Sequence, residues 1–173
     1  MSGAKEGEAF VRRALEGCRA ISAVEDLTTD MGSVDFRIQI PEVVDINLKE
    51  KRSRYTDAFV KAANGVPQSE LICVDEVYLR RAFTSGNPFV LLLNDLTEDR
   101  WLYYSMWTLL LAPKVRFERE IHWHEEMVKG KVLYRVSRAD DSSPTLDVDA
   151  LLDVSRATVL GVSSLGSWQV HGD

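Results

Sequence analysis

Two neighbouring runs of alternating apolar and polar residues constrain the fold of this chain more than any other feature. The apolar sets are Val34, Phe36, Ile38 and Ile40 in the first run and Val44, Ile46 and Leu48 in the second. A period of two is typical of a β-strand with one apolar face, and the short Pro41–Glu42 interruption favours an antiparallel hairpin. The hairpin places Asp35 across from Asn47 or Lys49, with these side chains on one face.

The flanking segments predict the other elements of the core. Apolar residues recur at helical spacing from about residue 4 to residue 19, and Asp75 to Phe83 reads as a second helix capped by Asp75. The continuous apolar run Phe89 to Leu93 is typical of a strand buried on both faces. The order helix, strand, strand, helix, strand predicts an α/β (α+β) domain with a mixed central sheet flanked by helices.

The rest of the chain carries weaker signals. Further strands are expected at Trp101–Ser105, Val115–Ile121 and Val132–Val136, a short helix at Met106–Leu111, a loop at Asp140–Pro144 and a helix near Asp147–Arg156. At 173 residues the chain suits one domain, 1–173. We expect its core at about 4–138, followed by a C-terminal helix and a loose tail over 139–173.

Composition narrows the class of protein. A hydrophobic fraction of 45% and a charged fraction of 28% exclude a disordered or collagen-like chain. The sequence contains neither a secretory signal nor an apolar run of membrane-spanning length, so no membrane partner is expected. Cys18 and Cys73 lie far apart in apolar surroundings, which favours free thiols and a cytoplasmic location. The net charge of −6 is opposite to that of proteins that coat nucleic acid.

The hairpin face carries residues that suit phosphodiester chemistry. A carboxylate and a lysine on adjacent strands can hold a divalent cation and bind a phosphate, and Mg²⁺ prefers such hard oxygen ligands. The candidate group is Asp35, Asn47 and Lys49, with Glu8 reaching in from the rim of the first helix. Lys49 would orient water or bind phosphate as a compact point charge.

These residues resemble the PD-(D/E)XK nuclease superfamily, which has the restriction-endonuclease-like fold. The resemblance rests on Glu8 in the first helix, Asp35 in VDFRIQI and Lys49 in INLKEK, and covers roughly residues 4–95. It implies Mg²⁺ (or Mn²⁺) as cofactor, DNA as substrate and metal-dependent hydrolysis of phosphodiester bonds. The catalytic residues that it implies are Asp35, Lys49 and Glu8.

The sequence departs from the superfamily pattern at one position. Two residues before Lys49 the superfamily has Asp or Glu, whereas this chain has Asn47, whose amide oxygen can ligate a metal without adding negative charge. Asp45 lies two residues earlier on the same strand face, roughly 6–7 Å away, and is the candidate to compensate. The expected metal ligands are therefore Asp35, Asp45 and Asn47.

Two further segments suggest partners. Lys51, Arg52 and Arg54 follow Lys49 closely and are expected to contact the phosphates of DNA. The aromatic segment Trp101–Leu111 is better suited to core packing or to an interface, either in a homodimer or with another protein, than to stacking on bases.

Three interpretations remain open on the sequence alone. The first is a metal-dependent nuclease acting through Asp35, Lys49 and Glu8. The second is a catalytically inactive module of the same fold, acting in DNA binding or protein–protein interaction, which Asn47 and the acidic net charge favour. The third is an unrelated α+β interaction domain, in which the polar hairpin face is an ordinary solvated surface.

Overall fold

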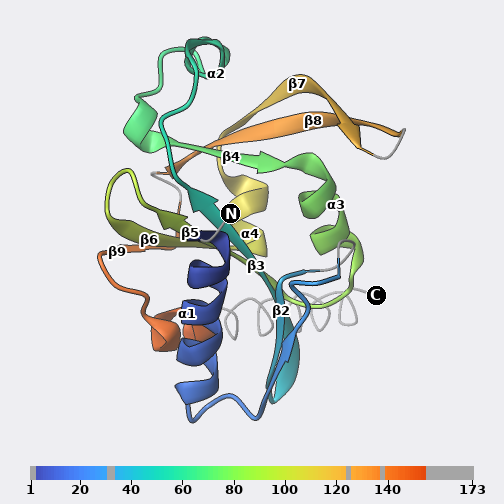
Figure 1. Cartoon of the computed structure of the whole chain (residues 1–173), viewed down its shortest axis with the longest axis vertical. Coiled ribbons are helices and arrows are strands. Elements are labelled where there is room, and N and C mark those ends of the chain that lie inside the picture. The colour runs from blue at the N-terminus through green and yellow to red at the C-terminus, as the bar shows by residue number, and fades with distance from the viewer. Residues whose placement is uncertain (1–2, 31–33, 124–125, 137–138, 155–173) are drawn as a thin grey trace, which may run out of the picture.

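The computed structural model describes residues 3–30, 34–123, 126–136 and 139–154 of the chain (Figure 1). In chain order its elements are α1 (Gly3–Gly17), β1 (Ala23–Asp26), β2 (Phe36–Ile40), β3 (Glu42–Lys51), α2 (Asp57–Ala62), a 3₁₀ turn (Gln68–Glu70), β4 (Leu71–Asp75), α3 (Glu76–Thr84), β5 (Phe89–Asp95), β6 (Arg100–Ser105), α4 (Met106–Leu111), β7 (Lys114–Trp123), β8 (Glu126–Arg135) and β9 (Asp141–Ser143). Residues 148–154 form a further helical segment.

The central sheet has six strands in the order β1-β2-β3-β5-β6-β9. It is mixed, as predicted, because β3 pairs in parallel with β5 while its other strand pairs are antiparallel. The predicted hairpin is also present: β2 and β3 pair from Ile40↔Glu42 to Phe36↔Ile46. Extending this register by one pair places Asp35 opposite Asn47.

Both faces of the central sheet are covered, which explains why β5 reads as a continuous apolar run. On one face, Val11 and Leu15 of α1 pack together with Leu151 and Leu152 against alternate residues of the sheet. Figure 1 shows α1 and this C-terminal helix on the same side of the sheet. The amphipathic pattern of α1 therefore serves to bury one stripe on the sheet.

The other face of the sheet is covered by α3, α4 and a second sheet. This three-stranded antiparallel sheet has the order β4-β8-β7, and its buried Ile72 and Tyr134 share a core cluster with Leu91 and Tyr104 of the central sheet. The sequence predicted the strands in β7 and β8 but neither β4 nor a separate sheet. The polar residues Asp45 and Asn47 of β3 consequently face a protein layer and are buried.

The C-terminal part of the described chain belongs to the core more closely than expected. The segment predicted as a loop contains the edge strand β9, which pairs with β6. Its sequence, Asp-Ser-Ser, has little strand propensity, so pairing with its neighbour and not local preference produces this strand. The predicted loose tail lies largely outside the described residues. Within the described parts, no helix has the length and apolar character needed to span a membrane.

Candidate functional site

The candidate site lies where β3 extends beyond the start of β2. Pairing with β2 ends at Ile46, whereas pairing with β5 continues to Lys51. The edge of β3 facing β2 would therefore present an unpaired amide at Leu48. Asp35, the residue that precedes β2, fills this position: the Leu48 N–H donates to Asp35 Oδ2 over 2.5 Å.

Asp35 carries the most informative ionisation in this region. Burial raises the pKa of its carboxyl group to about 6, although the hydrogen bond from the Leu48 amide lowers it. The negative charge of Glu8 raises the pKa further, and the positive charge of Lys49 lowers it. Glu8 and Lys49 therefore each lie within electrostatic reach of Asp35.

Lys49 has a partner that sequence reasoning missed. Its Nζ lies 3.3 Å from Oδ2 of Asp75, the last residue of β4. The other oxygen, Oδ1, lies 2.8 Å from Nζ of Lys131 in β8. A hint was available, since Asp75 stands out as the only charged residue of the apolar strand β4, LICVD. On the sequence alone, Asp75 is expected only to cap the helix that follows it.

Asp45 and Asn47 lie on β3 as expected, but Asp45 is already engaged. Its carboxylate is 1% exposed and accepts a 2.7 Å hydrogen bond from Nε of Arg37, its partner across the hairpin. Nδ2 of Asn87 donates to its second oxygen over 3.3 Å. The structure therefore gives Asp45 an ion pair within the hairpin, between β3 and β2. Asn47 lies next along the same face and is 5% exposed.

An open pocket of about 230 Å³ adjoins this region. It is lined by Glu8, Leu48, Lys49, Glu50 and Arg52. Glu50 Oε2 accepts two hydrogen bonds from the Arg52 guanidinium. A methyl group at Gly7 would meet the flexible end of the Glu50 side chain, which shows that α1 lies close to β3 here.

The predicted DNA-contacting residues separate into two kinds. Arg52 and Arg54 are exposed. Lys51 is buried: its side chain is 2% exposed, and its Nζ lies 3.4 Å from Asp95 Oδ2 and donates to the carbonyl oxygen of Gln68. Alternation along β3 points Lys51 into the protein interior, where it pairs with the fully buried Asp95 instead of facing solvent.

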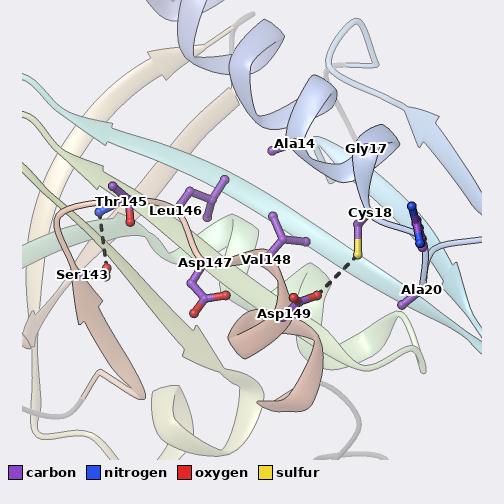
Figure 2. Close-up of a pocket in the computed structure, with 11 residues that line it drawn as sticks. Ala14, Gly17, Cys18, Ala20, Ser143, Thr145, Leu146, Asp147, Val148 and Asp149 are labelled. Carbon is purple, nitrogen blue, oxygen red and sulfur yellow. Dashed lines mark hydrogen bonds between the residues drawn. The ribbon is translucent and has the colours of Figure 1, made fainter.

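A larger pocket lies at the opposite end of α1. It has a volume of about 680 Å³, and Cys18, Thr145 and Asp149 are among its lining residues (Figure 2). Cys18 Sγ lies 3.8 Å from Asp149 Oδ1. Glu8 and Gly17 are nine residues apart on α1, roughly 13 Å along the helix axis. This pocket is therefore separate from the Asp35 region.

The segment Trp101–Leu111 divides between core and surface. Tyr103 and Tyr104 are buried, and Trp101 stacks on Phe10 of α1 with ring centroids 5.8 Å apart. Leu110 and Leu111 at the end of α4 are 48% and 78% exposed. Trp101, Tyr103 and Tyr104 thus pack within this chain, and the end of α4 presents an apolar surface.

The oxygen donors around Asp35 suit a hard divalent cation whose other ligands are waters or substrate phosphates. Within the described ranges, no three His, Cys, Asp or Glu side chains gather into a ready-made metal site. Mg²⁺ is commonly held by one or two carboxylates together with waters and substrate phosphates. Asp35 and Glu8 are two such carboxylates, their mutual repulsion would be relieved by a cation, and Asp35 Oδ1 is the oxygen not used by the Leu48 amide.

Comparison with known proteins adds no relative: no protein-family model, curated protein or solved structure matches this chain significantly.

Proposed function

We propose that this protein is a metal-dependent nuclease that hydrolyses DNA phosphodiester bonds at Asp35, in the manner of the PD-(D/E)XK superfamily that its sequence resembles. The observation that carries the proposal is the half-buried Asp35 carboxylate beside the unpaired end of β3, with Glu8 and Lys49 in electrostatic reach. A desolvated carboxylate beside a second carboxylate is a costly arrangement, and binding a cation would offset that cost.

The order of the elements supports the same proposal. The resemblance implies a helix, a hairpin carrying the two motif segments, a second helix and a further strand. The chain provides α1, then β2 and β3, then α3 and β5, with β5 parallel to β3. Asp35 stands at the start of one hairpin strand and Lys49 near the end of the other, so the two lie at the same end of the hairpin.

The residues have distinct roles in this proposal. Asp35 is the main metal ligand, Glu8 the second carboxylate, and the Asn47 amide a neutral neighbour on β3. A bound Mg²⁺ or Mn²⁺ supplies Lewis-acid activation of water and of the phosphodiester. The Lys49 ammonium stabilises the negative charge that develops on the phosphate or orients the attacking water.

A second candidate is a catalytically inactive member of the same fold that binds DNA or a protein. The side chains themselves favour it: Asn47 adds no negative charge to Asp35 and Glu8, and Lys49 is already paired with Asp75. Such a module would show no cleavage with any divalent cation.

The test is cleavage of supercoiled plasmid DNA, with single-stranded and duplex oligonucleotides as further substrates, in Mg²⁺ or Mn²⁺. We expect nicking by the wild type, loss of activity in Asp35→Ala and Lys49→Ala, and wild-type activity in the exposed controls Glu98→Ala and Lys61→Ala. Activity that survives both site substitutions would remove this site from consideration. A wild type that cleaves nothing, with correct folding, would favour the inactive module.

A further inference from the structure

We infer that Asp75 is a positioning residue for Lys49, and that Lys131 holds Asp75 in place for this task. The three residues are called here the lysine–aspartate–lysine cluster. As a statement about catalysis the inference rests on the proposed function. The contact itself is independent of that function and can be tested separately.

The conformation of Asp75 points to this role. It occupies the N-cap position of α3, where an aspartate normally accepts a hydrogen bond from an amide in the first helical turn. Its side chain makes no such bond. The helix thereby forgoes a contribution of about 1 kcal/mol, and both carboxylate oxygens are directed to lysines instead. A residue with a purely local capping role would not be oriented in this way.

The two lysines contact Asp75 in different ways. Asp75 and Lys131 are direct partners in the β4–β8 ladder, so the backbone register brings them together. Lys131 is 16% exposed and its Nζ lies 2.8 Å from Asp75 Oδ1. Lys49 is 34% exposed and its Nζ lies 3.3 Å from Oδ2. The more buried, shorter pair fixes the carboxylate, which then holds the more exposed ammonium.

The net charge of the cluster also suits a site that binds phosphate. One carboxylate between two ammonium groups leaves a net charge of +1. Burial alone would raise the pKa of Asp75, but the hydrogen bonds and charges of the two lysines lower it, so the carboxylate stays ionised. Lys49 is therefore held without losing the positive potential that attracts a phosphate. Without Lys131, the Lys49–Asp75 pair would have no net charge.

The cluster also connects the two layers of the protein. Lys49 belongs to the central sheet, whereas Asp75 and Lys131 belong to the second sheet. A lysine has a flexible four-carbon stem, and an anchor on a facing layer removes much of its rotamer freedom before substrate arrives. The second sheet thus takes part in the site by setting where the Lys49 ammonium lies.

The test compares Asp75→Asn and Asp75→Ser with the matched control Glu76→Gln. Serine retains the ability to cap α3, so Asp75→Ser removes the carboxylate while protecting the fold. Glu76 is the adjacent carboxylate and pairs with Arg80 and Arg116, not with Lys49. Steady-state DNA cleavage is measured for each variant, together with the rate at which acetic anhydride acetylates Lys49, followed by mass spectrometry.

In both Asp75 variants we expect kcat to fall on the order of 10- to 100-fold, as for other residues that orient a reacting group, with KM within about twofold of wild type. Lys49 acetylation should rise severalfold in these variants, because the free ammonium loses its partner, and should be unchanged in Glu76→Gln. If the wild type cleaves DNA and both Asp75 variants match Glu76→Gln, the inference is wrong while the proposed function stands.

If the wild type cleaves nothing, the proposed function fails and acetylation decides the inference about the contact. A rise in Lys49 reactivity confined to the Asp75 variants would support Asp75 as its positioning residue. Unchanged reactivity in those variants would overturn it.

Discussion

The Asp35 carboxylate accepts a hydrogen bond from the backbone amide of Leu48, just beyond the last residue of β3 that pairs with β2. This one contact matters both for the fold and for the proposed reaction. An edge amide would otherwise lack a strand partner, and the residue that satisfies it is the one whose negative charge the proposed reaction needs.

The ionisation of Asp35 predicts a stability cost in the metal-free protein. Burial raises its pKa from 3.8 to about 6, so the folded state binds this proton more tightly than the unfolded state. The free energy of unfolding therefore falls as pH rises from about 4 to about 6, by at most roughly 3 kcal/mol, and the cost is complete above that window. Asp35→Asn keeps an oxygen for the Leu48 amide and removes the charge.

We therefore expect Asp35→Asn to be more stable than wild type in EDTA at pH 7.5, by roughly 1–3 kcal/mol. Urea unfolding at several pH values checks this, and the difference should shrink as the pH approaches 4. If Asp35→Asn is less stable than wild type at pH 7.5, the ionised Asp35 carboxylate does not destabilise the folded state.

We expect replacement of Asn47 by aspartate to raise the affinity for divalent cations. Asn47→Asp adds a carboxylate opposite Asp35 with little change of shape, so divalent-cation affinity should rise severalfold. Stability in EDTA should fall, because a third negative charge joins Asp35 and Glu8. Calorimetric titration with Mn²⁺ measures the first effect and thermal unfolding the second. Unchanged affinity would place Asn47 outside the cation's reach.

Asp45 tests the difference between a structural carboxylate and a metal ligand. Nε of Arg37 lies 2.7 Å from Oδ1 of Asp45, and the Asp45 side chain is buried. Asp45→Asn should lower the free energy of unfolding by about 2–3 kcal/mol, less than for a pair buried on both sides because Arg37 can turn to solvent. Mn²⁺ affinity should be unchanged. A matching fall in affinity would restore Asp45 as the ligand predicted from the sequence.

Among the basic residues after Lys49, we expect the buried one to affect stability and the exposed ones to affect DNA binding. Lys51→Met should destabilise the fold by about 3 kcal/mol, because it leaves the Asp95 charge with fewer partners, and should not change the salt dependence of DNA binding. The double variant Arg52→Gln/Arg54→Gln should fold normally. It should reduce the slope of log K against log salt by about one for each phosphate that the protein no longer neutralises. An unchanged slope would exclude both arginines from the DNA-binding surface.

The sequence predicted the hairpin and its surroundings because local patterns specify them. Alternation defined β2 and β3, and the Pro41–Glu42 break centred the register that brings Asp35 opposite Asn47. The short helix α4 was predicted at Met106–Leu111, its observed bounds. In each case the evidence lies within a dozen residues and depends on periodicity.

The parts that could not be predicted depend on contacts distant in sequence. The Lys49–Asp75 pair joins residues 26 positions apart in different sheets, and Asp75–Lys131 joins strands that are separated by much of the chain. Lys51 was predicted to contact DNA together with Arg52 and Arg54, because nothing nearby in the sequence shows that it pairs with the buried Asp95. Charge patterning alone cannot distinguish a buried lysine from a solvated one.

Calorimetric titration of the wild type and Asp35→Ala with Mg²⁺ and Mn²⁺ at pH 7.5 tests the central claim most directly. The account predicts saturable binding by the wild type, accompanied by release of protons from Asp35 that grows as the pH is lowered toward 6, and no binding by Asp35→Ala. Equal binding by the two proteins, or none by a folded wild type, would contradict a metal site at Asp35.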